Sequence, residues 1–460
     1  MNESLFEIRS VPIPGLGNHA HVVVSGGVAA VVDVPRVATP VLDAVAETGA
    51  SVRWIAETHV HNDYLSGALE VRSLVGGDII GPEGAGYTFA ADELPDGATV
   101  PVGDVSLRVM STPGHTPEHV AYIVIAEDRP AAILSGGSLL LGSAGRTDLL
   151  GTQMADALGR AQFHSLRRIA ALPADVAVLP THGGGSFCAT GPAIAGASST
   201  VGREAASNPF VRARDEEEFL GIRTLDRYPY PAYYSAMAPA NRLGPPPAPA
   251  DLTPPPMSPD TLAAHVVRGA VIDIRDRWSF AAGHVPGSLG ISMDESAASY
   301  VGAVVPPGTE IALVSPHPLE ATEAARRLAR IGYEVVGALR GGFAAWEADG
   351  RPVATSRTLD AWELVERIDD PGITLLDVRN PWEWDEGIVP GSVTIHLGEL
   401  RSRLDELPRD RDLWVVCAAG RRSEVALSIL EAAGIEAGGV FLGGVAEIRE
   451  AVKDPSPGRA

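Results

Sequence analysis

The chain has 460 residues, of which 45% are hydrophobic and 20% charged, so it can form several folded domains, and disorder along its whole length is excluded. Asp and Glu outnumber Lys and Arg by 58 to 36, and the resulting charge of −22 argues against nucleic acid or an anionic membrane as a partner. No apolar run reaches the roughly 20 residues that span a bilayer, and no signal peptide is recognisable, so a cytoplasmic location is expected.

The N-terminal region, residues 1–238, is predicted to be one large domain that mixes strands with helices. Apolar runs predict strands at residues 21–24, 29–33, 52–57, 105–111, 120–126, 131–134 and 176–179. Of these, the first two and the pair 105–111 and 120–126 are expected to form hairpins. The other three end just before segments that carry polar motifs, so potential functional side chains gather at strand ends.

Histidines dominate these motifs. The strand at 52–57 leads to THVHNDY, which holds His59, His61 and Asp63, whereas His115 and His182 lie in glycine- and proline-containing turns further along the chain. Imidazole and carboxylate groups together suit Zn, Fe or Mn. Any one of these histidines could be an ordinary hydrogen-bonded loop residue. Four histidines and an aspartate at strand ends together indicate a metal site.

This set of motifs resembles the metallo-β-lactamase superfamily, whose signature is His-x-His-x-Asp-His, over residues 5–234. Within it, the stretches THVHNDYLSG, STPGHTPEHV and GRTDLL are most similar to the persulfide dioxygenases. The resemblance implies an αββα sandwich and one Fe²⁺ held by His59, His115 and an aspartate, with Zn²⁺ as an alternative. His61, Asp63 and His182 are additional candidate ligands.

Two positions depart from this family pattern. The aspartate ligand of the family falls on Gly137, and the last histidine of the signature is Tyr64. The second change breaks the two-metal set of the hydrolytic relatives, which makes a glyoxalase-type thioester hydrolase the least favoured function. His59, His61 and His115 could still form a three-imidazole site, and an aspartate at position 137 is expected to raise iron occupancy.

Three residues are candidates for positions near the substrate: Tyr64, Arg146 in GRTDLL, and Cys188 in HGGGSFC. Cys188 is one of only two cysteines, so a disulfide framework is excluded. Its thiol could meet substrate sulfur. Nothing in the local sequence favours a thiolate there, and a small buried side chain is the simpler interpretation.

A proline-rich stretch, residues 239–256, is predicted to be a stiff linker. Beyond it the chain is duplicated: VIDIRDRWSFAAGHVPGS at 271–288 matches LLDVRNPWEWDEGIVPGS at 375–392. Each unit is domain-sized and alternates short strands with helices. The sequence therefore predicts two tandem α/β domains with parallel sheets, at residues 257–354 and 355–453.

In the second repeat, a strand leads to the loop CAAGRR and then to a helix. Backbone N–H groups of such a loop and the helix N-terminus can stabilise a sulfur anion on Cys417. Gly420 allows the tight turn, and Arg422 supplies a fixed charge for an anionic sulfur donor. Cys417, Gly420, Arg421 and Arg422 are therefore the candidate catalytic residues, with Ser423 as the expected N-cap.

Residues 358–452 resemble a rhodanese domain with a six-residue active-site loop. The first repeat has Ser315 at the cysteine position, and a hydroxyl group cannot carry a persulfide. Two prolines in the loop also remove N–H donors. The first repeat is therefore interpreted as a non-catalytic rhodanese-like domain.

The domain order resembles bacterial persulfide dioxygenase–sulfurtransferase fusions. That resemblance implies iron-dependent oxidation of a low-molecular-weight thiol persulfide to sulfite, and sulfur transfer through a Cys417 persulfide. Sulfite or thiosulfate would be the further small-molecule partner. The alternative is a sulfurtransferase only, whose N-terminal domain serves as a binding module. A homo-oligomer is compatible with either function.

Overall fold

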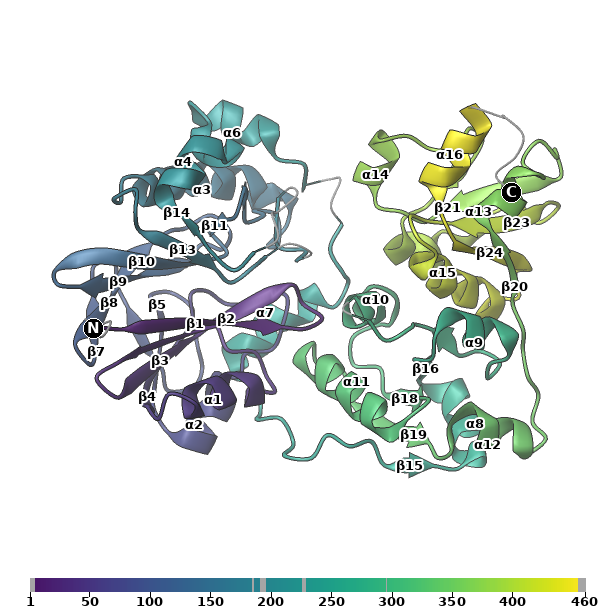
Figure 1. Cartoon of the computed structure of the whole chain (residues 1–460), viewed down its shortest axis with the longest axis horizontal. Coiled ribbons are helices and arrows are strands. Elements are labelled where there is room, and N and C mark those ends of the chain that lie inside the picture. The colour runs from purple at the N-terminus through teal and green to yellow at the C-terminus, as the bar shows by residue number, and fades with distance from the viewer. Residues whose placement is uncertain (1–4, 184–185, 191–195, 226–228, 295, 454–460) are drawn as a thin grey trace. The chain divides into compact units, whose positions relative to one another are not determined.

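The computed structural model describes residues 5–183, 186–190, 196–225, 229–294 and 296–453 (Figure 1). The chain divides into two compact units. The first comprises residues 1–250 together with 329–332, and the second comprises residues 251–328 and 333–460.

The first unit contains two six-stranded sheets. In order across the sheet, the first consists of β1 (Glu7–Ile13), β2 (Asn18–Ser25), β3 (Val28–Val32), β4 (Ser51–Ala56), β5 (Asp78–Pro82) and β6 (Asp92–Leu94). The second consists of β14 (Ser199–Thr200), β13 (Ala177–Pro180), β10 (Arg129–Gly136), β9 (Val120–Ala126), β8 (Val105–Ser111) and β7 (Thr99–Val102). β2 pairs antiparallel with β3, and β8 with β9, so both predicted hairpins are confirmed.

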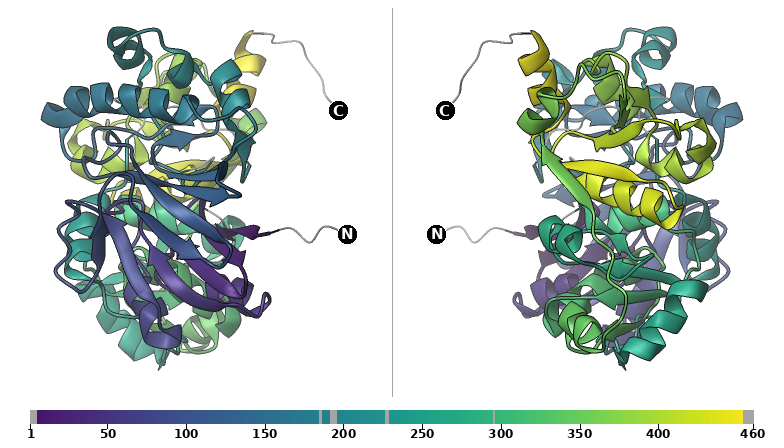
Figure 2. Two further views of the ribbon diagram at one scale, coloured as in Figure 1. Left: turned by 90° about the vertical axis from the view of Figure 1, so that its left-hand side faces the viewer. Right: turned by 90° about the vertical axis from the view of Figure 1, so that its right-hand side faces the viewer.

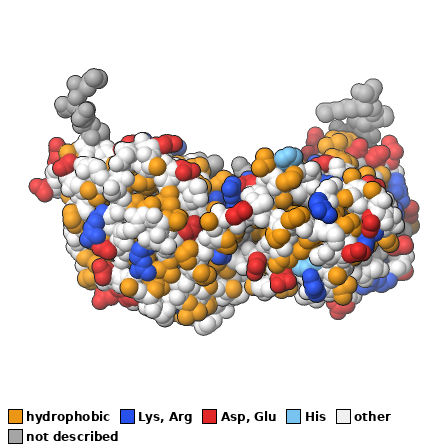
Figure 3. Space-filling view, turned by 90° about the horizontal axis from the view of Figure 1, so that it is seen from below, with side chains coloured by type: hydrophobic (Ala, Val, Ile, Leu, Met, Phe, Trp, Pro, Cys, Tyr) orange, Lys and Arg blue, Asp and Glu red, His pale blue; other side chains and the backbone are white. Residues whose placement is uncertain are grey.

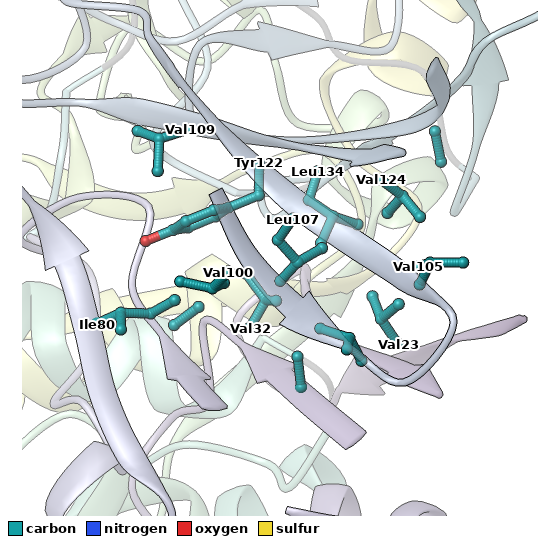
Figure 4. Close-up of a cluster of buried hydrophobic side chains, with 14 of the residues drawn as sticks. Val23, Val32, Ile80, Val100, Val105, Leu107, Val109, Tyr122, Val124 and Leu134 are labelled. Carbon is teal, nitrogen blue, oxygen red and sulfur yellow. The ribbon is translucent and has the colours of Figure 1, made fainter. Parts of the chain in front are cut away.

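The two sheets bury a shared apolar core. Figure 4 shows Val23 and Val32 of the first sheet packed with Leu107, Tyr122 and Leu134 of the second. These side chains alternate with others that face away from the core, as expected for strands with one face in the sandwich. Burial of this apolar surface is what holds the two sheets together.

Helices cover the outer faces of both sheets (Figure 2, left). Helices α1 and α2 pack on the first sheet, and a second apolar cluster joins α3, α4, α5 and α6 to the second sheet. Their bounds are α1 (Thr39–Ala46), α2 (Ala68–Val75), α3 (Thr152–Ala170), α4 (Val201–Ser207), α5 (Pro209–Arg212) and α6 (Glu216–Ile222), and β11 (Leu139–Leu140) and β12 (Ser143–Ala144) form a small separate hairpin. The expected αββα sandwich is confirmed.

The predicted linker contains regular structure at both ends. Helix α7 (Tyr234–Leu243) runs past residue 238 and includes Pro239. At the other end, β15 (Pro256–Met257) pairs with the first sheet of the second unit. The stretch without helix or strand is therefore confined to residues 244–255.

The second unit shows the duplication directly, because it has two five-stranded parallel sheets of the same strand order. The first repeat has β15, β19 (Val335–Leu339), β18 (Ile311–Val314), β16 (Ala270–Asp273) and β17 (Leu289–Gly290). The second has β20 (Arg357–Asp360), β24 (Ala437–Leu442), β23 (Asp412–Val416), β21 (Ile373–Asp377) and β22 (Val393–Thr394). The prediction of parallel sheets in both repeats is confirmed.

Helices flank these strands in both repeats, as short βαβ connections require (Figure 2, right). The first repeat has α8 (Pro259–Arg268), α9 (Arg277–Ala282), α10 (Ala297–Val304), α11 (Pro318–Arg330) and α12 (Gly342–Ala348). The second has α13 (Ala361–Val365), α14 (Pro381–Asp385), the 3₁₀ turns η2 (Leu397–Ser402) and η3 (Leu404–Glu406), α15 (Arg421–Ala432) and α16 (Val445–Lys453).

The surface agrees with the acidic composition. On the face shown in Figure 3, the Arg and Lys side chains lie as separate spots among acidic, apolar and neutral groups. Within the described part of the chain, none of the helices has the length and apolar character needed to cross a bilayer.

Candidate metal centre and cysteine loop

The histidine motif lies in the irregular segment between β4 and α2. His59, His61 and Asp63 are all buried there, and the loops after β8 and β13 bring His115 and His182 beside them. The ring centroid of His59 is 4.1 Å from that of His61, 4.9 Å from that of His115 and 5.4 Å from that of His182. The structure thus brings together the predicted candidate ligands from three segments of the chain.

Three of these imidazoles have the spacing of ligands to one ion. The ligand atoms of His59, His115 and His182 lie within 4.8 Å of one another. Nε2 of His59 is 3.4 Å from Nε2 of His182, and Nε2 of His115 is buried without a hydrogen-bond partner among the described residues. Nitrogens that bind one ion tetrahedrally at about 2.1 Å lie about 3.4 Å apart. The cluster therefore fits a divalent metal ion.

His115 is oriented by its main-chain surroundings. Its Nδ1–H donates to the carbonyl of Arg146 at 2.8 Å, which leaves Nε2 to face the cluster. Burial lowers the pKa of His115 to about 3, so the imidazole is neutral, as a metal ligand must be. The ring lies against Gly137 and Gly145, and a Cβ atom at either position would be too close to it.

This packing changes the expected effect of an aspartate at position 137. The sequence alone suggests that Gly137 has simply lost a carboxylate, and that an aspartate there would raise iron occupancy. A side chain at position 137 would overlap the imidazole of His115. Because His115 would have to move, Gly137→Asp is instead expected to disturb the cluster.

His61 and Asp63 extend the cluster. Nε2 of His61 lies 3.2 Å from Oδ1 of Asp33, while its Nδ1 is buried without a partner among the described residues. Oδ2 of Asp63 accepts a hydrogen bond from Asn18 at 2.6 Å, and its Oδ1 is similarly unpartnered. Although burial opposes it, the neighbouring His182 lowers the pKa of Asp63 to about 2, so this side chain is a carboxylate. Together with His182, these two residues form a second set with metal-ligand spacing.

Tyr64 packs behind the cluster. Its ring stacks on His61 with centroids 4.3 Å apart, and its hydroxyl donates to the carbonyl of Asp33 at 3.1 Å. The side chain is 1% exposed. Tyr64 thus supports His61 from the interior, in the place where the family signature has its last histidine.

The other two substrate-near candidates are also buried. Arg146 forms a two-pronged ion pair with Asp148, with N–O distances of 2.7 and 2.8 Å, and its carbonyl holds His115. The main-chain N–H of Arg146 donates to the carbonyl of Cys188 at 2.8 Å. The Cys188 thiol lies 3.8 Å from the hydroxyl of Tyr234, and burial raises the pKa of that thiol. A small buried side chain remains the simpler interpretation of Cys188.

Two residues of the cluster escaped the sequence interpretation. His119 accepts a hydrogen bond from the Gly137 N–H at 2.9 Å and stacks on His59. Asp33, at the end of β3, accepts a hydrogen bond from the Thr58 N–H at 2.7 Å and lies beside His61. Both residues could have been identified from the sequence, since His119 is in the motif STPGHTPEHV and Asp33 is a carboxylate at a strand end.

The cysteine loop follows β23 directly. Cys417 is 1% exposed, and its Sγ accepts a hydrogen bond from the Gly420 N–H at 3.1 Å. Gly420 has φ of +84°, and a Cβ atom there would overlap the carbonyl of Phe441, so only glycine fits. Helix α15 begins at Arg421 with Gly420 as its N-cap, so the prediction of Ser423 as N-cap is wrong.

Both arginines of the loop pair with carboxylates. Arg422 holds Glu383 through both terminal nitrogens, with Nη2 2.7 Å from Oε1. Burial opposes ionisation of Glu383, but the hydrogen bonds from Arg422 lower the pKa of that carboxyl. Arg421 reaches Asp294 of the first repeat at 3.0 Å. These pairs fix the loop that carries Cys417.

The equivalent loop of the first repeat closes on itself. The Ser315 hydroxyl donates to the carbonyl of His317 at 2.8 Å. The main-chain N–H of Leu319 donates a hydrogen bond to the imidazole Nδ1 of His317 at 3.2 Å. This loop offers no anion site comparable with that of Cys417.

Known proteins resemble both parts of the chain. A family model described as "Rhodanese-like domain" matches residues 258–349 and 360–451. A probable metallo-hydrolase from Burkholderia pseudomallei is 36% identical over 207 residues, which is 39% of this chain and 67% of the relative. A hydroxyacylglutathione hydrolase from Acidiphilium cryptum is 31% identical over 244 residues, which is 47% of this chain and 95% of the relative.

A solved structure shares the fold. The crystal structure of a metallo-β-lactamase from Staphylococcus aureus superimposes with a TM-score of 0.66 and 23% identity. The match covers 73% of this chain and 99% of that chain. At this level of identity the likeness concerns the fold alone.

Proposed function

Because this chain belongs to the metallo-β-lactamase-fold family that includes the hydroxyacylglutathione hydrolases, and carries two rhodanese-like domains, we propose that it is a sulfurtransferase that carries sulfane sulfur on Cys417. The observation that supports this best is the hydrogen bond of 3.1 Å from the Gly420 N–H to the Cys417 sulfur. An N–H donor at the start of a helix stabilises a thiolate, and equally the terminal sulfur of a persulfide.

The transfer takes place in two displacements. The Cys417 thiolate attacks the outer sulfur of thiosulfate, the S–S bond of thiosulfate breaks, and its electron pair leaves with sulfite. Cys417 then bears the persulfide Cys–S–S⁻. A thiolate acceptor attacks the outer sulfur of that persulfide, forms a new S–S bond and releases the Cys417 thiolate. A low-molecular-weight thiol persulfide can replace thiosulfate as the donor, with the free thiol as leaving group.

The two cysteines supply a matched test. Cys417→Ser is expected to lower sulfur transfer from thiosulfate to an acceptor thiol by about 1,000-fold or more, because serine cannot hold sulfane sulfur. Cys188→Ser is expected to leave the transfer rate within about twofold, since the buried Cys188 thiol takes no part in the two displacements. Cyanide-labile sulfur on the protein should disappear in the first variant only. Substantial transfer by the Cys417 variant would disprove the assignment.

A second activity is supported by the histidine cluster. Three buried imidazoles converge, and the unpartnered Nε2 of His115 faces the cluster. Fe²⁺ held by His59, His115 and His182 would supply open coordination positions for O₂ and a sulfur ligand. The proposed overall reaction is RSSH + O₂ + H₂O → RSH + SO₃²⁻ + 2 H⁺. The sulfite formed is an acceptor for the Cys417 persulfide, and that transfer gives thiosulfate.

Two positions favour one metal ion over two, although His61, Asp63 and His182 also have the spacing of ligands. The Tyr64 ring stacks on His61 while its hydroxyl donates to the Asp33 carbonyl, and Gly137 has no side chain, so neither position supplies the ligand that the family pattern has there. This is why thioester hydrolysis by a two-metal centre is the less favoured activity. If the cluster binds no metal, the N-terminal domain is a binding module for thiol persulfides.

The chain's two free thiols accord with a reducing, cytoplasmic location.

Metal binding and oxidation are tested together on protein reconstituted anaerobically with Fe²⁺. His115→Ala is expected to weaken iron binding by about 100-fold or more and to abolish oxygen uptake with glutathione persulfide. His164→Ala, at an exposed histidine on α3, is the control and should retain its iron. Iron content that is unchanged by His115→Ala would exclude this ligand set. Iron without oxygen uptake would exclude the dioxygenase and leave the sulfurtransferase.

A further inference from the structure

The cysteine-free repeat makes direct contact with the Cys417 loop of the second repeat. Arg277 Nη1 donates to the carbonyl of Ala419 at 3.1 Å. Asp294 pairs with Arg421 at 3.0 Å, and the Ser292 hydroxyl donates to Glu424 at 2.8 Å. The residues contacted are Ala419, Arg421 and Glu424, which all lie in the cysteine loop or in the first turn of α15. The first repeat therefore touches the part of the second repeat that carries the proposed chemistry.

The contact from Arg277 is aligned with the sulfur. The carbonyl of Ala419 and the N–H of Gly420 belong to one peptide group, and all described peptide bonds are trans. In a planar trans peptide the C=O and N–H point in opposite directions. One end of this peptide binds the Arg277 guanidinium, and the other donates to Cys417 Sγ at 3.1 Å. A cation at the oxygen polarises the peptide and makes its N–H a stronger donor.

The internal duplication shows that Arg277 is not required by its own helix. The two repeats align Asp276 with Asn380 as N-caps of α9 and α14, and Arg277 with Pro381 as the next residue. Proline is favoured at the first helical position, whereas a cation there is opposed by the helix dipole. The arginine is thus placed where helix stability gives no reason for it, and its guanidinium binds the other repeat.

We infer that the cysteine-free repeat is a working part of the Cys417 site, and that Arg277 is a positioning residue for the sulfur anion. It acts through the Ala419–Gly420 peptide, which it holds with the N–H directed at Sγ. This inference deepens the proposed sulfurtransferase function and rests on it. It gives the first repeat a role although that repeat carries no cysteine of its own.

The test measures the reactivity of the Cys417 thiol and not the rate of sulfur transfer. In a Cys188→Ser background Cys417 is the only thiol, and its rate of alkylation by iodoacetamide is measured against pH. Arg277→Met is expected to move the midpoint of that profile to higher pH and to slow alkylation at pH 7 by about three- to tenfold. Arg277→Lys, which keeps the charge, should restore most of the rate. Arg268→Met, at an exposed arginine of the same repeat, should leave the profile unchanged.

The outcomes separate this inference from the function it rests on. An Arg277→Met profile identical to that of Arg268→Met would overturn the role of Arg277. A shifted profile in a protein that transfers no sulfur would support Arg277 and disprove the sulfurtransferase. If Arg277→Met fails to fold, Arg277→Gln keeps a neutral donor to the Ala419 carbonyl. It is then expected to give a smaller shift in the same direction, and an unshifted profile would overturn the inference.

Discussion

The two rhodanese-like repeats have nearly the same scaffold around different loops. In each, an arginine binds the aspartate two residues before it and a main-chain carbonyl eight residues after it. Arg275 makes the latter bond at 2.7 Å and Arg379 at 2.8 Å. Both pairs, with Asp273 and Asp377, are largely buried. A structural device that has survived in a repeat without a cysteine serves the fold and not the chemistry.

The loops differ at the positions that matter for a sulfur anion. Ser315 stands in place of Cys417, and Pro318 in place of Gly420. Proline has no N–H, so the hydrogen bond to Cys417 Sγ cannot have a counterpart in the first repeat. The comparison teaches that the parallel sheet alone provides no sulfur site, and that the loop donors must be present as well.

The strongest challenge to this comparison is to place the cysteine in the wrong loop. Adding Ser315→Cys to the Cys417→Ser variant is expected to restore no sulfur transfer, so that activity stays about 1,000-fold or more below the unmodified protein. The reason is that the loop around position 315 is closed by its own hydrogen bonds. The measurement is cyanide-labile sulfur bound to the protein after exposure to thiosulfate.

The parent Cys417→Ser variant is the control for that experiment. Recovery of even one hundredth of the original activity in the double variant would mean that a cysteine at the strand end is sufficient. The difference between the two loops would then have no chemical significance.

A smaller effect is expected when Gly420 of the Cys417 loop is replaced. Gly420→Ala should destabilise the protein by about 2–3 kcal/mol and lower transfer activity, because φ is +84° and the new Cβ meets the Phe441 carbonyl. Gly434→Ala is the control, since it has φ of +69° but nothing within 4 Å of the added atom. It should cost about 1 kcal/mol. Denaturant unfolding gives both values, and equal losses would show that the carbonyl contact has no effect.

The smallest expected effect concerns a pair present only in the second repeat. Glu383 aligns with Ser279, and Arg422 with Glu320, so the first repeat lacks the Glu383–Arg422 pair. Glu383→Gln should destabilise the protein by about 1–3 kcal/mol near neutral pH.

The sign of its pH dependence follows from the lowered pKa of Glu383. A carboxyl whose pKa is lower in the folded protein stabilises the fold above its ordinary value of 4.5, and that stabilisation is lost as pH falls through the folded pKa. The difference between the unmodified protein and Glu383→Gln should therefore shrink on acidification. A difference in unfolding free energy that stays constant between pH 7 and pH 3 would contradict this role.

The sequence was most informative where a site is contiguous. The cysteine loop could be predicted because Cys417, Gly420 and Arg422 lie within six residues between a strand and a helix. The error at Ser423 arose because Gly420, in a left-handed conformation, starts the helix earlier than the usual capping pattern indicates. The αββα sandwich was predicted from motif resemblance, since the pairing of its two sheets is not visible in any local pattern.

The sequence was least informative where partners are distant along the chain. Asp33 and His119 join the histidine cluster only because the folded strands bring their ends together. The packing of His115 against Gly137 reversed the expected effect of an aspartate there. Arg277 and Ala419 are 142 positions apart, and an arginine that binds a main-chain oxygen gives no signature in either sequence segment.

The contact between Arg277 and Ala419 uses only a main-chain atom of residue 419. Because Arg277 binds the carbonyl of Ala419, the side chain at position 419 takes no part in it. The loop can therefore acquire different side chains at 418 and 419 without losing the support of the first repeat. A substitution at either exposed position can change the surface of the loop while the contact that orients the Ala419–Gly420 peptide is retained.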